Sequence, residues 1–186
     1  MILQVALAAF LVTQVEGVLQ AGRDAPAPTR TRYVAPQFPL MARQASPPLM
    51  GVVVLEVTLD TDGRPVDIRV LYGIPLLDAA AIDAVKEWRY APTVVDGAAR
   101  RVVLREVVDL FPDAMAATRY FATVVESGRA QKALRVIAAN RLAASGRTPK
   151  KFVVEALQKA SEDPDPDIKA AAARALDTLA STGKTQ

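Results

Sequence analysis

The side chains in this sequence that could take part in chemistry are carboxylates, which gather in two short acidic stretches. Asp60 and Asp62 lie in the motif Asp-Thr-Asp-Gly, and Asp163, Asp165 and Asp167 alternate with prolines. A calcium loop needs further oxygen ligands and a bidentate glutamate, which the first motif lacks. Aspartates in turns and before helices more often form turns and caps. We therefore expect turn formation and helix capping here, and no metal site.

The composition excludes most other catalytic machinery. The chain has neither cysteine nor histidine, which excludes thiolate nucleophiles, the common zinc sites and histidine-based triads. No motif with a defined catalytic mechanism is left. The sequence therefore predicts a protein that is not an enzyme and has no cofactor and no small-molecule substrate. A net charge of +3 is too small to indicate binding to nucleic acid.

Residues 1–21 have an apolar stretch, but it is short for a membrane span. It runs from Val5 to Val12, whereas a spanning helix needs about 20 mostly apolar residues. Three interpretations stay open: a signal peptide, a weak membrane anchor, and a truncated or soluble start. Residues 22–35 are rich in Pro, Thr and Arg and are predicted to be an extended linker.

Residues 36–111 have the pattern of a small α+β domain. After a short helix over 40–45, the alternating apolar residues from Val53 to Leu59 predict a strand. The turn at Gly63 leads into a second strand. A later segment, 100–111, has the pattern of a third strand. The expected fold is a three-stranded antiparallel sheet with two helices on one face.

The second helix of this domain is predicted between the second and third strands. Its apolar stripe runs from Ala81 to Trp88, and Asp78 lies in the first turn, where a negative charge suits the helix dipole. Pro92 disfavours helical geometry just before it, so the helix should end near Trp88. Gly97 then marks a turn into the third strand.

Residues 112–186 have no strand signal and predict an all-α tail. The four expected helices cover 113–126, 129–144, 149–161 and 165–180. The aspartate-proline turn followed by an alanine-rich helix resembles HEAT-like repeats, which usually need three or more copies to be stable alone. We expect the tail to dock on the sheet or on another copy of the chain.

Several short motifs in residues 36–111 follow one another in a characteristic order. They are Pro-Gln-Phe-Pro, a strand opened by Gly51, the run LLDAAAIDAVKEWRYAP, and a glycine turn into the last strand. In this order and spacing they resemble the C-terminal domain of the TonB family of energy transducers. The positions that carry the resemblance are Pro39, Gly51, Gly63, Leu77, Asp78, Ala81, Trp88, Pro92 and Gly97.

The resemblance implies a binding protein of the periplasm or cell envelope, exported or anchored in the inner membrane. Such proteins bind an extended segment of an outer-membrane receptor or another envelope protein as an added strand. They link this binding to energy-dependent transport across the outer membrane. An inner-membrane proton-channel complex is a further partner that the resemblance implies.

The resemblance also implies which residues contact the partner. One region is the edge of the third strand, with Val102, Leu104, Glu106, Val107, Val108 and Leu110. The other is the extended segment before the first helix, with Ala35, Gln37 and Phe38. This chain departs from the family at Ala35, where some relatives carry glutamine, and in a longer connection between the first helix and Gly51.

A second hypothesis is an envelope scaffold that transmits no force. In that case the HEAT-like tail makes the protein–protein contacts, and the sheet is a packing module or a homodimer surface. The edge strands of two copies can pair as readily as an edge strand and a peptide. The sequence leaves this alternative open.

Overall fold

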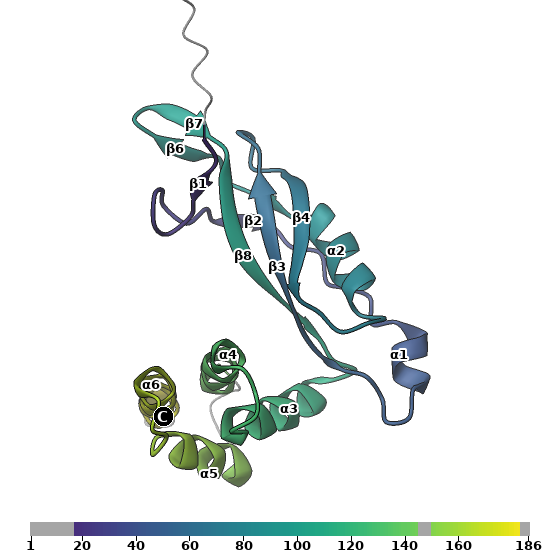
Figure 1. Cartoon of the computed structure of the whole chain (residues 1–186), viewed down its shortest axis with the longest axis vertical. Helices are drawn as coiled ribbons and strands as arrows, with labels where there is room; N and C mark the ends of the chain where they lie inside the picture. The colour runs from purple at the N-terminus through teal and green to yellow at the C-terminus, as the bar shows by residue number, and fades with distance from the viewer. Residues whose placement is uncertain (1–16, 145–149, 183–186) are drawn as a thin grey trace, which may run out of the picture.

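The computed structural model describes residues 17–144 and 150–182 and shows a strand-rich domain followed by a helical tail (Figure 1). The strands are β1 (Leu19–Gln20), β2 (Arg30–Arg32), β3 (Gly51–Leu59), β4 (Pro65–Tyr72), β5 (Arg89–Tyr90), β6 (Thr93–Val95), β7 (Ala98–Arg100) and β8 (Val102–Leu110). The helices are α1 (Leu40–Gln44), α2 (Asp78–Lys86), α3 (Ala114–Glu126), α4 (Lys132–Ala143), α5 (Lys151–Ala160) and α6 (Pro166–Thr182).

The main sheet has the strand order β1-β8-β3-β4. β3 pairs antiparallel with both β4 and β8, which gives the predicted three-stranded antiparallel sheet and confirms the α+β class. The short β1 adds a fourth strand, parallel to β8, that the sequence did not predict. Two small sheets, β2 with β5 and β6 with β7, flank this main sheet.

The alternation of β3 decides which face of the sheet is covered. Val53, Leu55, Val57 and Leu59 point to one face, where their exposed fractions are at most 1%. They pack there with Ala81 and Val85 of α2, with Leu77 just before the helix and with Trp88 just beyond it. Both predicted helices of this domain therefore contribute to one core, on one side of the sheet.

The hairpin between β3 and β4 depends on Gly63. Its φ is +77°, and a Cβ atom there would lie 2.1 Å from the carbonyl oxygen of Tyr90. A side chain is therefore excluded both by backbone conformation and by space. The carboxylate of Asp60 accepts hydrogen bonds from the amides of Asp62 and Arg64 at 2.9 and 2.8 Å, so this acidic motif forms a turn.

The third strand differs from its predicted bounds. The expected strand over 100–111 is divided into β7 and β8, and β7 pairs back with β6 across a tight turn. Asp96 and Gly97 have φ values of +52° and +77°, the pair of positive φ angles that a two-residue type I′ hairpin requires. The predicted glycine turn is present, but it closes its own small hairpin.

The segment predicted to be an extended linker is packed against the domain. Residues 22–35 include β2, and Ala25 is buried in the same core as α2. Of the segment predicted to be a signal peptide or anchor, residues 1–16 lie outside the described part of the chain, and Leu19–Gln20 form β1. Within the described residues, no helix is both long and apolar enough to cross a membrane.

The helical tail follows β8 directly and has its own core. Its four helices overlap the four predicted ones, and Asp113 caps α3 by accepting a hydrogen bond from the Ala116 amide at 2.8 Å. The tail core also includes Val52 of β3, so the tail docks on the end of the sheet. At the junction the ring of Phe111 lies 5.1 Å from that of Tyr120 and 5.3 Å from that of Phe121.

A buried arginine joins three parts of the tail. Arg135 of α4 donates from Nε and Nη2 to the carbonyl oxygen of Val125 at the end of α3, at 3.0 and 2.9 Å. Its Nη2 also lies 2.6 Å from the carboxylate of Asp163 in the turn before α6. Figure 1 shows these helices gathered at the end of the sheet opposite the β6–β7 hairpin. The HEAT-like character of the tail stays a prediction.

Candidate protein-binding site

β8 is bonded to β3 along its whole length, but its other side is paired at one end only. β1 pairs with Val102 and Val103 there. Among the described residues, no further strand pairs with Leu104–Leu110 on this outer side. Most of β8 is therefore a sheet edge, which we call the β8 edge.

The alternation of the backbone decides which residues offer hydrogen-bonding groups to the β8 edge. The carbonyl oxygen of Val103 accepts from the amide of Ala21 at 2.9 Å, on the side away from β3. Successive residues of a strand direct their N–H and C=O groups to opposite sides. Arg105, Val107 and Asp109 therefore direct theirs to the same outer side as Val103.

β1 occupies the first part of this edge as a short parallel strand. The amide of Leu19 donates to the carbonyl oxygen of Arg101 at 3.0 Å, and the side chain of Gln20 reaches the Val103 carbonyl at 3.4 Å. Because β1 has only two residues, it covers little of the edge. It also demonstrates that β8 accepts a parallel strand on this side.

The helical tail touches the other end of the β8 edge. Arg141 of α4 donates from Nη2 to the carbonyl oxygen of Val107 at 3.4 Å, and its Nε lies 2.9 Å from the carboxylate of Asp109. Burial raises the pKa of Asp109, and the neighbouring Arg141 guanidinium opposes that rise. A strand added here would have to share or displace this single side chain.

The side chains of the predicted edge residues lie on two different faces of the sheet. Val102, Val108 and Leu110 are at most 2% exposed and belong to the core shared with α2, and the half-buried Leu104 packs beside them. Their backbone groups face β3, so these residues support the edge from behind. Val107 packs on the opposite face against the tail core, while its backbone faces outward.

Glu106 belongs to a polar cluster that fastens the N-terminal segment to β8. Its carboxylate accepts a hydrogen bond from the Tyr90 hydroxyl at 2.9 Å and lies 3.4 Å from Nη1 of Arg30. Burial strongly raises the pKa of Tyr90, and the Glu106 carboxylate adds to the rise, so the phenol stays protonated. The Arg30 guanidinium also lies 4.2 Å from the ring centroid of Trp88 and 4.9 Å from that of Tyr33.

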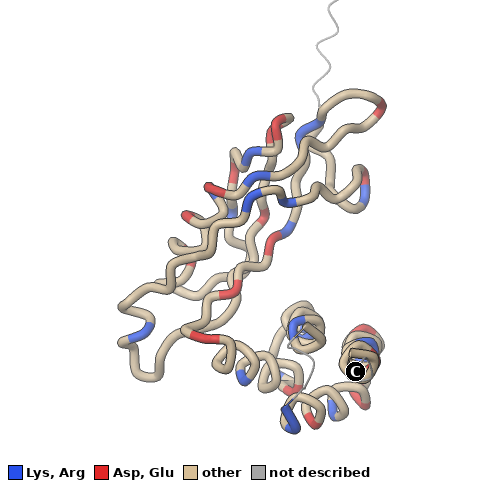
Figure 2. The backbone as a smooth tube through the Cα atoms, turned by 180° about the vertical axis from the view of Figure 1, so that it is seen from behind, with Lys and Arg blue, Asp and Glu red and all other residues tan. Residues whose placement is uncertain are grey.

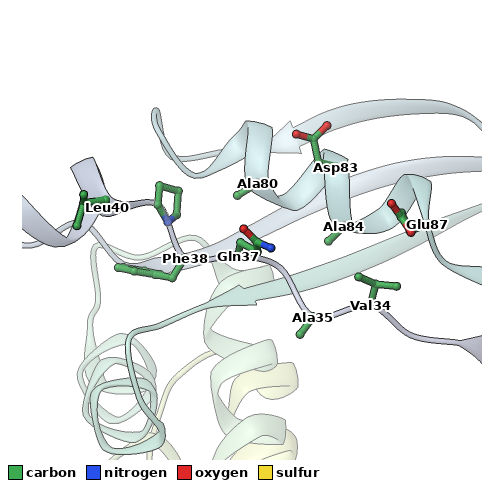
Figure 3. Close-up of a pocket in the computed structure, with 10 residues that line it drawn as sticks. Val34, Ala35, Gln37, Phe38, Leu40, Ala80, Asp83, Ala84 and Glu87 are labelled. Atoms are coloured by element: carbon green, nitrogen blue, oxygen red, sulfur yellow. The ribbon is translucent and has the colours of Figure 1, made fainter.

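A groove runs between the segment before α1 and one side of α2 (Figure 3). The segment is held at its start because Nε1 of Trp88 donates to the carbonyl oxygen of Val34 at 2.7 Å. The groove has a volume of about 620 Å³. Its lining residues are Val34, Ala35, Gln37, Phe38, Pro39, Leu40, Ala80, Asp83, Ala84 and Glu87.

The groove brings together the three predicted contact residues of this segment. Ala35 and Gln37 are exposed, and Phe38 is half-buried. The opposite wall carries the carboxylates of Asp83 and Glu87 (Figure 3). The groove therefore combines an apolar floor with an acidic rim, which suits an apolar side chain close to a positive charge.

Comparison with known proteins shows which family this part of the chain resembles. The model of the family "Gram-negative bacterial TonB protein C-terminal" matches residues 34–107. This stretch contains the groove, the core helix α2 and most of β8.

Residues 34–107 form a TonB C-terminal-like domain.

A curated relative, Protein TonB of Vibrio cholerae serotype O1 (strain ATCC 39315 / El Tor Inaba N16961), is 33% identical over 66 residues. The aligned part is 34% of this chain and only 26% of the relative, so the chain spans about a quarter of that protein. The solution NMR structure of the Pseudomonas aeruginosa TonB CTD has 28% identity, covers 46% of this chain and 89% of that one, and superposes with a TM-score of 0.35.

The TonB C-terminal-like match leaves two neighbours of the β8 edge outside it. β1 precedes the matched residues, and Arg141 follows them in the helical tail. Neither contact has a signal in the sequence. A two-residue parallel strand has no periodicity to detect, and a surface arginine on a helix does not reveal which strand it will reach.

The second acidic stretch forms caps, as the first forms a turn. The Asp163 carboxylate accepts from the amide of Asp165 at 2.9 Å, and the Asp165 carboxylate accepts from that of Asp167 at 2.9 Å. Over residues 17–144 and 150–182, no group of three or more acidic side chains is arranged to hold a metal ion.

Proposed function

We propose that the TonB C-terminal-like domain binds an extended segment of a cell-envelope partner by strand addition to the β8 edge. The partner we propose is an outer-membrane receptor, and the setting is energy-dependent transport across the outer membrane. The groove beside α2 is the second contact region. The family match over residues 34–107 supports the class of partner.

The observation that carries this proposal is the row of outward backbone groups on β8. Arg105, Val107 and Asp109 offer amide and carbonyl groups at the spacing that an added strand requires. Within the described part of the tail, Arg141 donates to the Val107 carbonyl, and no other tail residue bonds the backbone groups of these three residues. Amides and carbonyls unpaired on an edge are the usual template for another chain.

Binding can be measured with synthetic peptides that span periplasm-facing segments of outer-membrane receptors from the same organism. Arg105→Pro removes one outward amide, and its side chain is exposed, so the core is left intact. We expect this variant to lose most peptide affinity in calorimetric titrations while its circular dichroism melt stays close to that of the unchanged chain.

Val70→Pro is the matched control, because Val70 is 39% exposed on β4, the opposite edge of the same sheet. It should bind the peptides as the unchanged chain does. Equal loss of peptide affinity in both proline variants would contradict strand addition at β8. So would full binding by Arg105→Pro.

A scaffold role is the second candidate, and a surface of the tail favours it. A cavity of about 650 Å³ lies between α4 and α6, with Val136 and Ile137 on its floor and Lys132, Asp167 and Arg174 around it. Apolar surface with a charged rim is typical of a protein-binding site. In this role, Ile137→Asp would abolish capture of an envelope protein, whereas Arg105→Pro would not.

A further inference from the structure

The second edge of the main sheet, on β4, is free and unusually exposed. β4 ends the strand order, and among the described residues no strand pairs with its outer side. Three of its apolar side chains are well exposed: Val66 at 51%, Val70 at 39% and Leu71 at 48%. Figure 2 shows acidic and basic residues interspersed in the strand domain. β4 itself carries one charge of each sign, Asp67 and Arg69, so this edge is not protected by charges of one sign.

The central residues of β4 read Val66-Asp67-Ile68-Arg69-Val70, a sequence that is self-complementary when two copies run antiparallel. Pairing centred on Ile68 places each Asp67 opposite an Arg69 and each Val66 opposite a Val70. Opposite charges and β-branched residues across an antiparallel pair stabilise it, and like charges directly opposite destabilise it.

The backbone geometry of β4 fits this centre. β3 uses its odd-numbered residues to bond β8, so its even-numbered residues face β4. Asp67 and Arg69 are paired with Thr58 and Glu56 and therefore turn their backbone groups to β3, while Ile68 turns its own outward. Two copies can thus exchange both backbone hydrogen bonds at Ile68.

The same geometry brings the charges close together. Asp67 and Arg69 would form non-hydrogen-bonded pairs, in which facing side chains approach most closely. In the single chain these two side chains lie on one face and pair with each other at 3.2 Å, with exposed fractions of 49% and 71%. They are free to exchange partners across a two-fold axis. Centring the pairing on Asp67 or on Arg69 instead would oppose like charges.

We propose that this chain forms a homodimer by antiparallel pairing of β4 with β4 of a second copy, centred on Ile68. The register shifts next to Asp67 and Val70 limit the regular part of β4 to this short centre. The association is therefore weak and depends on protein concentration. Both β8 edges lie on the outer sides of the joined sheets and stay available.

Charge reversal in the full chain tests the proposal by sedimentation equilibrium over a range of concentrations. Asp67→Arg alone and Arg69→Asp alone each oppose two like pairs, and we expect association to weaken about tenfold or more. An equimolar mixture of these two variants restores both opposite-charge pairs and should dimerise. The double variant D67R/R69D should dimerise with itself for the same reason.

Asp177→Arg and Arg129→Asp are controls that make the same charge changes at exposed positions of the tail region; they should dimerise as the unchanged chain does. Dimerisation that survives each single reversal at β4, or a chain that stays monomeric at millimolar concentration, would overturn the proposal. Failure of the mixture to associate would overturn the register.

The register can be checked independently because the chain has no cysteine. Ile68→Cys places two thiols across the axis at about 5.5 Å between Cα atoms, within the range that a disulfide spans. It should form a disulfide-linked dimer on mild oxidation. Val70→Cys should not, because in this register Val70 of one copy lies opposite Val66 of the other copy, four residues away from its Val70. Peptide binding at the β8 edge should be unchanged in every β4 charge variant, so failure of one proposal leaves the other testable.

Discussion

The strand domain and the helical tail satisfy their backbone groups in opposite ways. In the tail each helix bonds its own backbone, and the helices close around a core of alanine, valine and leucine. In the strand domain the ladders extend sideways, and among the described residues no strand pairs with the outer side of β4 or with most of the outer side of β8. The tail helices therefore satisfy their backbone groups internally, whereas the sheet ends at two edges where backbone groups can accept a partner.

This difference locates the candidate functions. Binding at an edge uses backbone groups, so it depends on which residues point outward and little on side-chain identity. Binding on the tail would depend on side chains such as Val136 and Ile137 between α4 and α6. The variants below separate the two regions, because each weakens only one of them.

The largest expected effect comes from Trp88→Ala in the strand domain. Trp88 is 1% exposed and also holds Val34 through its indole N–H, so its loss leaves a large cavity. We expect a destabilisation of about 3–5 kcal/mol. Hydrogen exchange followed by mass spectrometry should show faster exchange in β3, β4 and β8, and unchanged exchange in α5 and α6. Equal acceleration in both regions would mean that they unfold together.

Arg135→Leu is the corresponding change in the tail. It leaves the buried carbonyl oxygen of Val125 without its two donated hydrogen bonds, which costs about 1–3 kcal/mol. Chemical denaturation should show lower stability, with the faster exchange confined to α3–α6. The stability of Arg135→Lys should lie between that of the unchanged chain and that of Arg135→Leu, because lysine keeps the charge but cannot donate from two nitrogens of a planar fork. A melt identical to that of the unchanged chain would show that the buried arginine has no structural role.

A smaller effect is expected at the junction of the two regions, from Asp113→Ala. The Asp113 carboxylate caps α3 by accepting from the Ala116 amide, and removing such a cap costs about 1 kcal/mol. Thermal unfolding should register this loss, and Asp113→Asn should retain most of the stability. A loss as large for the asparagine variant would point to charge and not to capping.

The smallest effect is a dependence of tail stability on pH. The amide of Asp165 and the guanidinium of Arg135 lower the pKa of Asp163 below its ordinary value. A lowered pKa stabilises the folded tail above the ordinary value of about 4 and stops doing so as the pH falls through the lowered value. Melting temperatures recorded from neutral pH down to about pH 2 should fall less in Asp163→Asn than in the unchanged chain. If the melting temperatures of the two chains fall by the same amount over this pH range, Asp163 does not contribute to the pH dependence.

The tail helices and the central strands could be predicted from sequence because their signals are local. The first tail helix, predicted over 113–126, and the strand predicted from Val53 to Leu59 are each indicated by residues within or next to the element itself. The packing of residues 22–35 could not be predicted in this way. It depends on Trp88 and Glu106, far along the chain, and its proline-rich composition is also that of a free linker.

The candidate site was predictable in outline and not in detail. The resemblance indicated β8 and the segment before α1, but the residues named on β8 were mostly those whose side chains form the core. The sequence shows which residues are apolar in a strand such as Val102–Leu110. It does not show the side to which each backbone group turns, which depends on the register with β3.

The three aromatic rings at the junction of β8 and α3 have a mechanical consequence. Because the ring of Phe111, the residue after β8, packs against Tyr120 and Phe121 of α3, we expect this junction to resist hinging. Any molecule attached to the tail is then held at a fixed angle to a guest strand lying on β8. The tail would then determine the direction from which a partner strand can reach the β8 edge.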